Sequence, residues 1–110
     1  MVALAPVGDL HDAYARDLDD GAAAALMGGS PTTLPEAYAE ADPAVRLASP
    51  PTARVVVLHG TADPLVPVEN SDWARRNPHV ELRLLEGIDH FEVIDPRSAA
   101  WPAVLAALSD

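Results

Sequence analysis

The sequence of 110 residues contains no cysteine, which excludes disulfides and thiolate metal sites and leaves the redox compartment undetermined. It also contains no lysine: all seven basic residues are arginine, against 17 acidic residues, and the formal net charge is −10. An acidic chain without a basic cluster repels phosphate backbones, so we expect no nucleic-acid partner. No segment approaches the about 20 apolar residues that span a bilayer, and the N-terminus lacks the pattern of a signal peptide. We therefore expect a cytoplasmic protein without a membrane partner.

Bulky side chains are also scarce. Aromatic residues make up 5% of the chain, although 49% of it is hydrophobic, mostly alanine and valine. The length suits one domain, but a core so thin in large side chains is expected to depend on neighbouring structure. The abundance of alanine, proline, aspartate and glycine, with arginine in place of lysine, is typical of a GC-rich bacterial genome.

The first half of the chain reads as one strand followed by short helices. The strand is expected over residues 2–5, and Leu10, Tyr14 and Leu18 recur at the spacing of an amphipathic helix. Asp20 can cap a second helix that ends at Gly28-Gly29. Thr33 and Glu36 form a capping-box pattern for a third helix, which ends before Asp42-Pro43.

The second half alternates strands and helices. The β-branched run 55–58 predicts a strand covered on both faces of a parallel sheet, and residues 80–84 predict a strand nearer its edge. A short helix holds Trp73, and a last helix is expected to pack through Trp101, Val104, Leu105 and Leu108. This alternation predicts an α/β fold with a parallel sheet of about three strands flanked by helices. Complete sheets usually have five or six strands, so we expect part of a sheet.

Two loops carry residues suited to catalysis. A carboxylate lies just beyond the predicted strand 55–58, in the stretch Leu58-His59-Gly60-Thr61-Ala62-Asp63-Pro64-Leu65-Val66-Pro67. An imidazole lies beyond the predicted strand 80–84, in the stretch Gly87-Ile88-Asp89-His90-Phe91. Open α/β sheets form their active sites at that end of the strands. Asp63 and His90 can therefore meet there, with the carboxylate accepting the Nδ1 proton and stabilising the imidazolium that forms when Nε2 takes a proton.

These loops, in this order, resemble those of the α/β-hydrolase family, His-Gly-x-x-Asp-x-x-Val-Pro followed by Gly-x-x-His-Phe. The resemblance implies that Asp63 and His90 are the acid and the histidine of a catalytic triad whose third member is a serine. It covers essentially the whole chain, residues 1–110, but only the C-terminal half of the family's domain. It implies a helical insert region at about 10–48 and acid and histidine loops at 59–67 and 86–91. The segment 91–96 resembles kynurenine formamidases and small esterases.

The sequence departs from the family at the nucleophile. No Gly-x-Ser-x-Gly elbow exists, and the nearest serine, Ser30, follows a predicted helix and precedes a proline, which is typical of a turn. The oxyanion hole that the family builds beside the nucleophile is missing as well. We therefore expect a serine hydrolase acting on a small-molecule ester or amide, without a cofactor, whose chain as given carries acid and base alone and is inactive by itself.

Other interpretations remain open. His59 with Asp63, or Asp89 with His90, offers oxygen and nitrogen ligands, but neither pair has a recognised metal-ligand spacing, so no metal is expected. His59 is expected to bond to backbone, and Asp89 to be a surface or loop-stabilising carboxylate. The alternative function is a non-catalytic binding or assembly module derived from an α/β-hydrolase. Such a module would cover its exposed first strand, for example by self-association.

Overall fold

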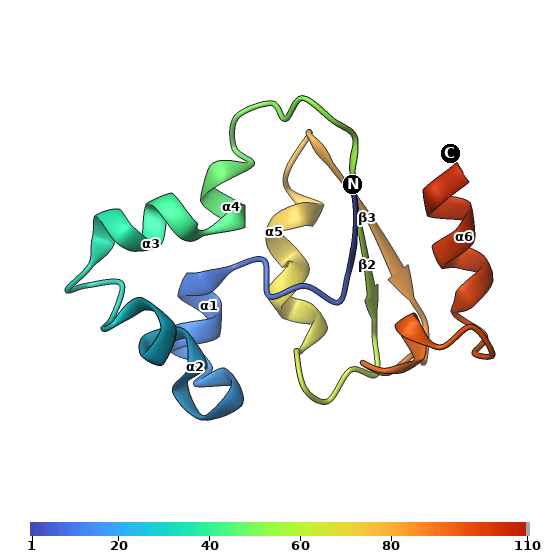
Figure 1. Cartoon of the computed structure of the whole chain (residues 1–110), viewed down its shortest axis with the longest axis horizontal. Coiled ribbons are helices and arrows are strands. Elements are labelled where there is room, and N and C mark those ends of the chain that lie inside the picture. Colours follow the sequence, from blue (N-terminus) through green and yellow to red (C-terminus); the bar gives the residue numbers. More distant parts are fainter. Residues whose placement is uncertain (110) are drawn as a thin grey trace.

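The computed structural model describes residues 1–109 and shows a three-stranded parallel sheet between helical layers (Figure 1). The strands are β1 (Val2–Leu4), β2 (Val55–Gly60) and β3 (Val80–Leu85). They lie in the order β1-β2-β3, and β2 pairs in parallel with both neighbours. The predicted α/β class and the three-stranded parallel sheet are confirmed, with β3 at one edge.

The central strand β2 is buried over its whole length, and its side chains alternate between two helical layers. Val55 and Val57 pack with Trp73 and Ala74 from the layer that contains α5 (Asp72–Arg75). The alternate residues of β2, Val56 and Leu58, pack on the opposite face against α6 (Trp101–Ser109). Each fully buried valine or leucine contributes roughly 1.5–3 kcal/mol, so this strand anchors the fold and fixes the position of the loop that follows it.

The remaining helices lie mainly in the segment between β1 and β2, on the α5 side of the sheet, with α2 and α3 farthest from the strands (Figure 1). They are α1 (Leu10–Ala15), α2 (Leu18–Met27), α3 (Pro35–Ala41) and α4 (Pro43–Arg46), and two short 3₁₀ turns follow at η1 (Val68–Ser71) and η2 (Glu92–Ile94). Gly28 ends α2 in the left-handed conformation with φ of 85°, as its position after the alanine run predicts.

Two predicted helix starts are wrong. The first helix ends at Ala15, and the backbone then passes through left-handed conformations at Asp17, Asp19, Asp20 and Gly21, with φ from 50° to 78°. Asp20 therefore belongs to a kink and does not cap the helix that follows, because a capping residue needs extended backbone. Thr33 does not form a capping box either.

The side chain of Thr33 is engaged in a turn with Ser30. The Thr33 amide donates to Ser30 Oγ at 3.1 Å, and the Thr33 hydroxyl donates to the Ser30 carbonyl at 3.2 Å. Leu34 occupies the first position before α3 and makes no side-chain cap. These bonds confirm the turn that was predicted around Ser30.

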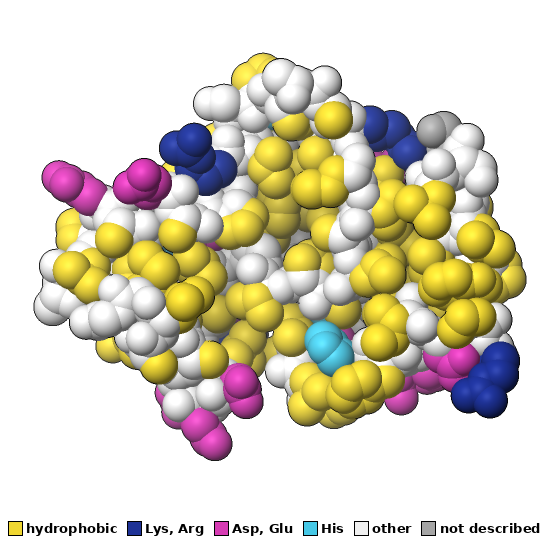
Figure 2. Space-filling model, viewed as in Figure 1, with side chains coloured by type: hydrophobic (Ala, Val, Ile, Leu, Met, Phe, Trp, Pro, Cys, Tyr) yellow, Lys and Arg dark blue, Asp and Glu magenta, His cyan; other side chains and the backbone are white. Residues whose placement is uncertain are grey.

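The buried face of α6 also differs from the predicted one. Val104 and Ala107 are buried against the sheet, whereas Leu105 and Leu108 are 49% and 64% exposed. Alanines on the inner face let the helix approach β2 closely, so its leucines lie on the outer side. Figure 2 shows apolar side chains gathered over this part of the surface.

The outer edge of β1 is unpaired within residues 1–109, because β1 pairs with β2 alone. Its backbone donors and acceptors on that side are available to another strand. None of the helices in the described part of the chain has the length and apolar character needed to cross a membrane.

Candidate active site

Asp63 lies in the loop after β2, and its carboxylate is held by backbone amides. Its Oδ1 accepts hydrogen bonds from the amides of Leu65 at 2.9 Å and Val66 at 2.8 Å, and its side chain is fully buried. Burial alone would raise the pKa of the Asp63 carboxyl. Three hydrogen bonds to the carboxylate outweigh burial, from the Val66 amide, from His90 and from the Leu65 amide. The pKa of Asp63 therefore lies below its usual value. The group is thus a carboxylate at neutral pH.

His90 lies in the loop after β3, and the structure brings it to Asp63 although 27 positions separate them in sequence. The distance from His90 Nδ1 to Asp63 Oδ2 is 2.7 Å. Because a carboxylate oxygen accepts, Nδ1 carries the proton and Nε2 is left to exchange one. The imidazole is 27% exposed, and its ring forms a T-shaped contact with the ring of Phe91 at 5.3 Å between centroids. The pair has the geometry of a carboxylate-oriented general base.

The two loops are joined by one backbone hydrogen bond and one that involves a side chain. The Thr61 hydroxyl accepts from the Gly87 amide at 2.8 Å, and the Ala62 amide donates to the Ile88 carbonyl at 3.1 Å. Gly60 makes this approach possible, since a Cβ at that position would lie 2.0 Å from the Ile88 carbonyl oxygen. The glycine of the His-Gly motif is therefore needed for close contact between the acid loop and the histidine loop.

The sequence paired His59 with Asp63 only as a candidate metal-ligand set, whereas the structure makes His59 part of the hydrogen-bonded site. It bonds to backbone as predicted, with Nε2 2.8 Å from the Val66 carbonyl oxygen, but its Nδ1 also lies 2.7 Å from Ser71 Oγ. Nε2 is 3.5 Å from Asp63 Oδ2. The alternation of β2 could have indicated a buried side chain at position 59, but no sequence pattern gave its contact with the acid.

A cavity of about 790 Å³ adjoins His90. Its walls come from the loop before α1, from α1, from α2 with the kink in its first turn, and from residues 64–66 of the acid loop. Most of the lining is apolar, and it also includes three aspartates, Asp17, Asp19 and Asp20. The described lining residues include no serine, threonine, cysteine, lysine or arginine. In Figure 2, apolar and acidic side chains and a histidine border the hollow between the helical region on the left and the lower end of the sheet. The cavity can hold an apolar substrate group beside the imidazole.

Asn70 fixes the α1 wall of this cavity to the rest of the fold. Its side chain is fully buried, accepts from the Gly8 amide at 3.1 Å, and donates to the Asp9 carbonyl at 3.0 Å and to Asp12 Oδ2 at 2.9 Å. These bonds span about 60 positions of sequence and tie the loop after β1 to the turn η1.

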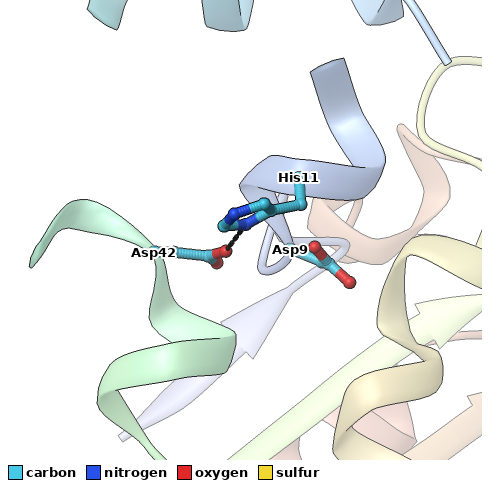
Figure 3. Close-up of side chains that lie close together, drawn as sticks. All are labelled: Asp9, His11 and Asp42. Atoms are coloured by element: carbon cyan, nitrogen blue, oxygen red, sulfur yellow. Dashed lines mark hydrogen bonds and ion pairs between the residues drawn. The ribbon is translucent and has the colours of Figure 1, made fainter. Parts of the chain in front are cut away.

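One cluster has the composition of a metal site, formed by Asp9, His11 and Asp42 (Figure 3). Its buried member, Asp42, already accepts from the amides of Leu10 and Ala44 and from His11 Nδ1 at 2.9 Å. The cluster therefore serves as a set of helix caps, and a metal would have to displace those bonds.

Asp89 and His59 are both engaged in hydrogen bonds with the loops that follow β3 and β2. Asp89 accepts from the amides of Phe91 and Glu92, both at 2.9 Å, and so stabilises its own loop as expected. The Nε2 atom of His59 is bonded to the Val66 carbonyl oxygen.

The chain has an α/β-hydrolase-like fold, of which it contains three strands and the two loops at their carboxyl ends. Among solved structures it is similar to puromycin hydrolase and to a serine-to-alanine mutant of puromycin hydrolase complexed with PGG. Each similarity covers 81% of this chain at 26% identity, with a TM-score of 0.57. The chain spans 14% of the length of either protein. No family model matches the sequence, and no curated protein matches it. The similarities confirm the predicted fold and reach no finer subgroup.

Proposed function

We propose that this chain supplies the acid and the base of a serine hydrolase that cleaves esters or amides. The observation that carries the proposal is the 2.7 Å bond between His90 Nδ1 and the buried Asp63 carboxylate, beside an apolar cavity. His90 Nε2 takes the proton of a hydroxyl nucleophile as its oxygen bonds to the substrate carbonyl carbon. The imidazolium then gives that proton to the leaving alkoxide or amine as the carbon–heteroatom bond breaks. Asp63 stabilises the imidazolium between the two transfers.

The nucleophile and the oxyanion hole come from polypeptide other than residues 1–109. The described walls of the cavity offer no hydroxyl or thiol, and the unpaired edge of β1 is the side on which a further strand can join the sheet. The proposal therefore predicts that the isolated chain does not react with a fluorophosphonate probe, which modifies activated serines. Stoichiometric labelling of the isolated chain would contradict this division of roles.

The substrate is proposed to be a small molecule with an apolar group that enters the cavity. The lining leucines and valines favour such a group. Two likenesses bear on the substrate: the segment 91–96 resembles kynurenine formamidases and small esterases, and the chain is similar to puromycin hydrolase.

A chimaera tests the proposal on a complete site. This chain would replace the matching 14% of puromycin hydrolase, and hydrolysis of puromycin and of an activated ester would be measured. The chimaera is expected to hydrolyse its substrate. The rate of hydrolysis should fall by about 10³-fold or more in its His90→Ala and Asp63→Asn variants. His79→Ala is the matched control, because His79 lines no part of the cavity. A cooperatively folded chimaera that is inactive, or whose activity survives both substitutions, would overturn the proposal.

An assembly module is the second candidate, favoured by the open edge of β1 and by the exposed leucines of α6. We propose that such a module would cover this edge with a second copy of the chain. Light scattering and thermal melting distinguish the two functions. A sharply melting dimer supports the module, whereas a monomer with a broad or weak transition supports a hydrolase half that depends on further polypeptide.

A further inference from the structure

We propose that His59 is a positioning residue for the acid–base pair, holding the Asp63 carboxylate in the orientation that His90 requires. The role rests on the proposed hydrolase function, although the contacts that support it lie entirely within this chain. His59, Asp63 and Ser71 come from the end of β2, the loop after it and the turn η1, and all three side chains are buried.

The imidazole of His59 is fixed on both of its nitrogens. A carbonyl oxygen can only accept, so the 2.8 Å contact with Val66 shows that Nε2 carries a proton. Nδ1 lies 2.7 Å from Ser71 Oγ, and the ring has no exposed surface. A buried ring with both nitrogens engaged has one orientation, because rotating it would leave polar atoms without partners.

In that orientation the Nε2–H group lies between the Val66 carbonyl and the acid. Its nitrogen is 3.5 Å from Asp63 Oδ2, the oxygen that also accepts from His90 at 2.7 Å. His59 therefore contributes a partial positive charge close to Oδ2 of the carboxylate. Its bond to the Val66 carbonyl also holds the residue whose amide donates to Asp63 Oδ1 at 2.8 Å. One ring thus supports both oxygens of the carboxylate.

Removing the Nε2–H group of His59 has two effects on the Asp63 carboxylate, and both act in the same direction. The carboxylate loses a nearby donor, and the Val66 amide is no longer held at Oδ1, while burial of the carboxylate remains. Both changes disfavour the charged form of Asp63, so its pKa is expected to rise. A looser carboxylate also weakens its bond with His90, which is how an effect at His59 reaches the imidazole that exchanges protons.

The test is a set of His59 variants of the 110-residue chain, followed by nuclear magnetic resonance. His59→Phe keeps a ring without donors, His59→Gln restores an N–H donor, and His79→Phe is the control at an unconnected histidine. The readouts are the carboxyl ¹³C titration of Asp63 and the far-downfield proton resonance of His90 Nδ1–H. A residue that only fills space would lower stability and leave both signals of the folded state unchanged.

The expected result is a rise of about one unit or more in the pKa of Asp63 in His59→Phe, with loss of the downfield resonance and recovery of both in His59→Gln. Unchanged signals in folded His59→Phe overturn the inference. Should that variant not fold, Ser71→Ala decides, because it frees Nδ1 without removing the ring: a rise in the pKa of Asp63 supports the inference and no rise overturns it. Failure of the chimaera to hydrolyse substrate would refute the hydrolase function and leave these signals unaffected.

Discussion

Replacing Gly60 by alanine tests how the two loops of the site are joined. An added Cβ would lie 2.0 Å from the Ile88 carbonyl oxygen and 2.6 Å from its carbon, whereas real contacts of this kind do not fall below 3.0 Å. The histidine loop must therefore retreat by at least about 1 Å, since 3.0 minus 2.0 is 1.0. Such overpacking costs about 1–3 kcal/mol. Loss of the bond between the Ala62 amide and the Ile88 carbonyl adds about 1 kcal/mol, so the free energy of unfolding should fall by about 2–4 kcal/mol.

The same shift should separate His90 from Asp63. His90 follows Ile88 by two residues. A movement of about 1 Å away from Asp63 would break the 2.7 Å bond between the two side chains. Urea unfolding gives the loss of stability, and the His90 Nδ1–H resonance reports the pair. Gly28→Ala is the matched control, because no atom lies within 4 Å of its Cβ position, although its φ of 85° carries a conformational cost of about 1–3 kcal/mol.

A stable Gly60→Ala variant would refute the reasoning. Where the backbone tolerates a side chain, replacing glycine by alanine stabilises a protein by about 0.4–1 kcal/mol. A gain of that size, with the His90 resonance intact, would mean that the loops do not depend on the missing side chain.

Three further outcomes are expected. Asn70→Ala should lower the free energy of unfolding by about 1–3 kcal/mol in urea titrations, because it leaves the buried Gly8 amide without an acceptor; a loss below 0.5 kcal/mol would contradict the role of Asn70 in holding the loop after β1. The pKa of Asp63 is lowered on folding, so its charged form adds stability that is fully present above the unfolded pKa of about 4 and is lost as pH falls through the folded pKa. At acid pH, Asp63→Asn should reduce the slope of the free energy of unfolding against pH by up to about 1.4 kcal/mol per pH unit. An unchanged slope would count against a lowered pKa of Asp63. In the chimaera, Asp19→Asn with Asp20→Asn should reduce the preference for a cationic substrate over its neutral isostere by about two- to fivefold at low salt; equal preference before and after would exclude a role for these charges.

The sheet and the acid–base pair could be predicted from local sequence. The run 55–58 is β-branched and continuous, and it becomes a strand buried on both faces. Residues 80–84 alternate and lie at the edge of the described sheet. Asp63 and His90 each follow a strand directly, and parallel strands bring their carboxyl ends together, so strand order alone places the two side chains near each other.

Packing between elements could not be predicted in the same way. Periodicity gave α6 an inner face that includes Leu105, but close approach to β2 favours the alanine face of that helix. A capping box at Thr33 fits the sequence pattern equally well as the turn that it forms with Ser30. The contact of His59 with the acid depends on how the loop closes over the end of β2, which no spacing in the sequence encodes.

The central claim is that Asp63 and His90 form a hydrogen-bonded acid–base pair, and the proton on His90 Nδ1 reports it most directly. Proton nuclear magnetic resonance of the chain at low temperature should show a far-downfield resonance that disappears in His90→Ala and in Asp63→Asn and persists in His79→Ala. Persistence of that resonance in Asp63→Asn, or its absence from the folded unmodified chain, would contradict the pairing seen at 2.7 Å.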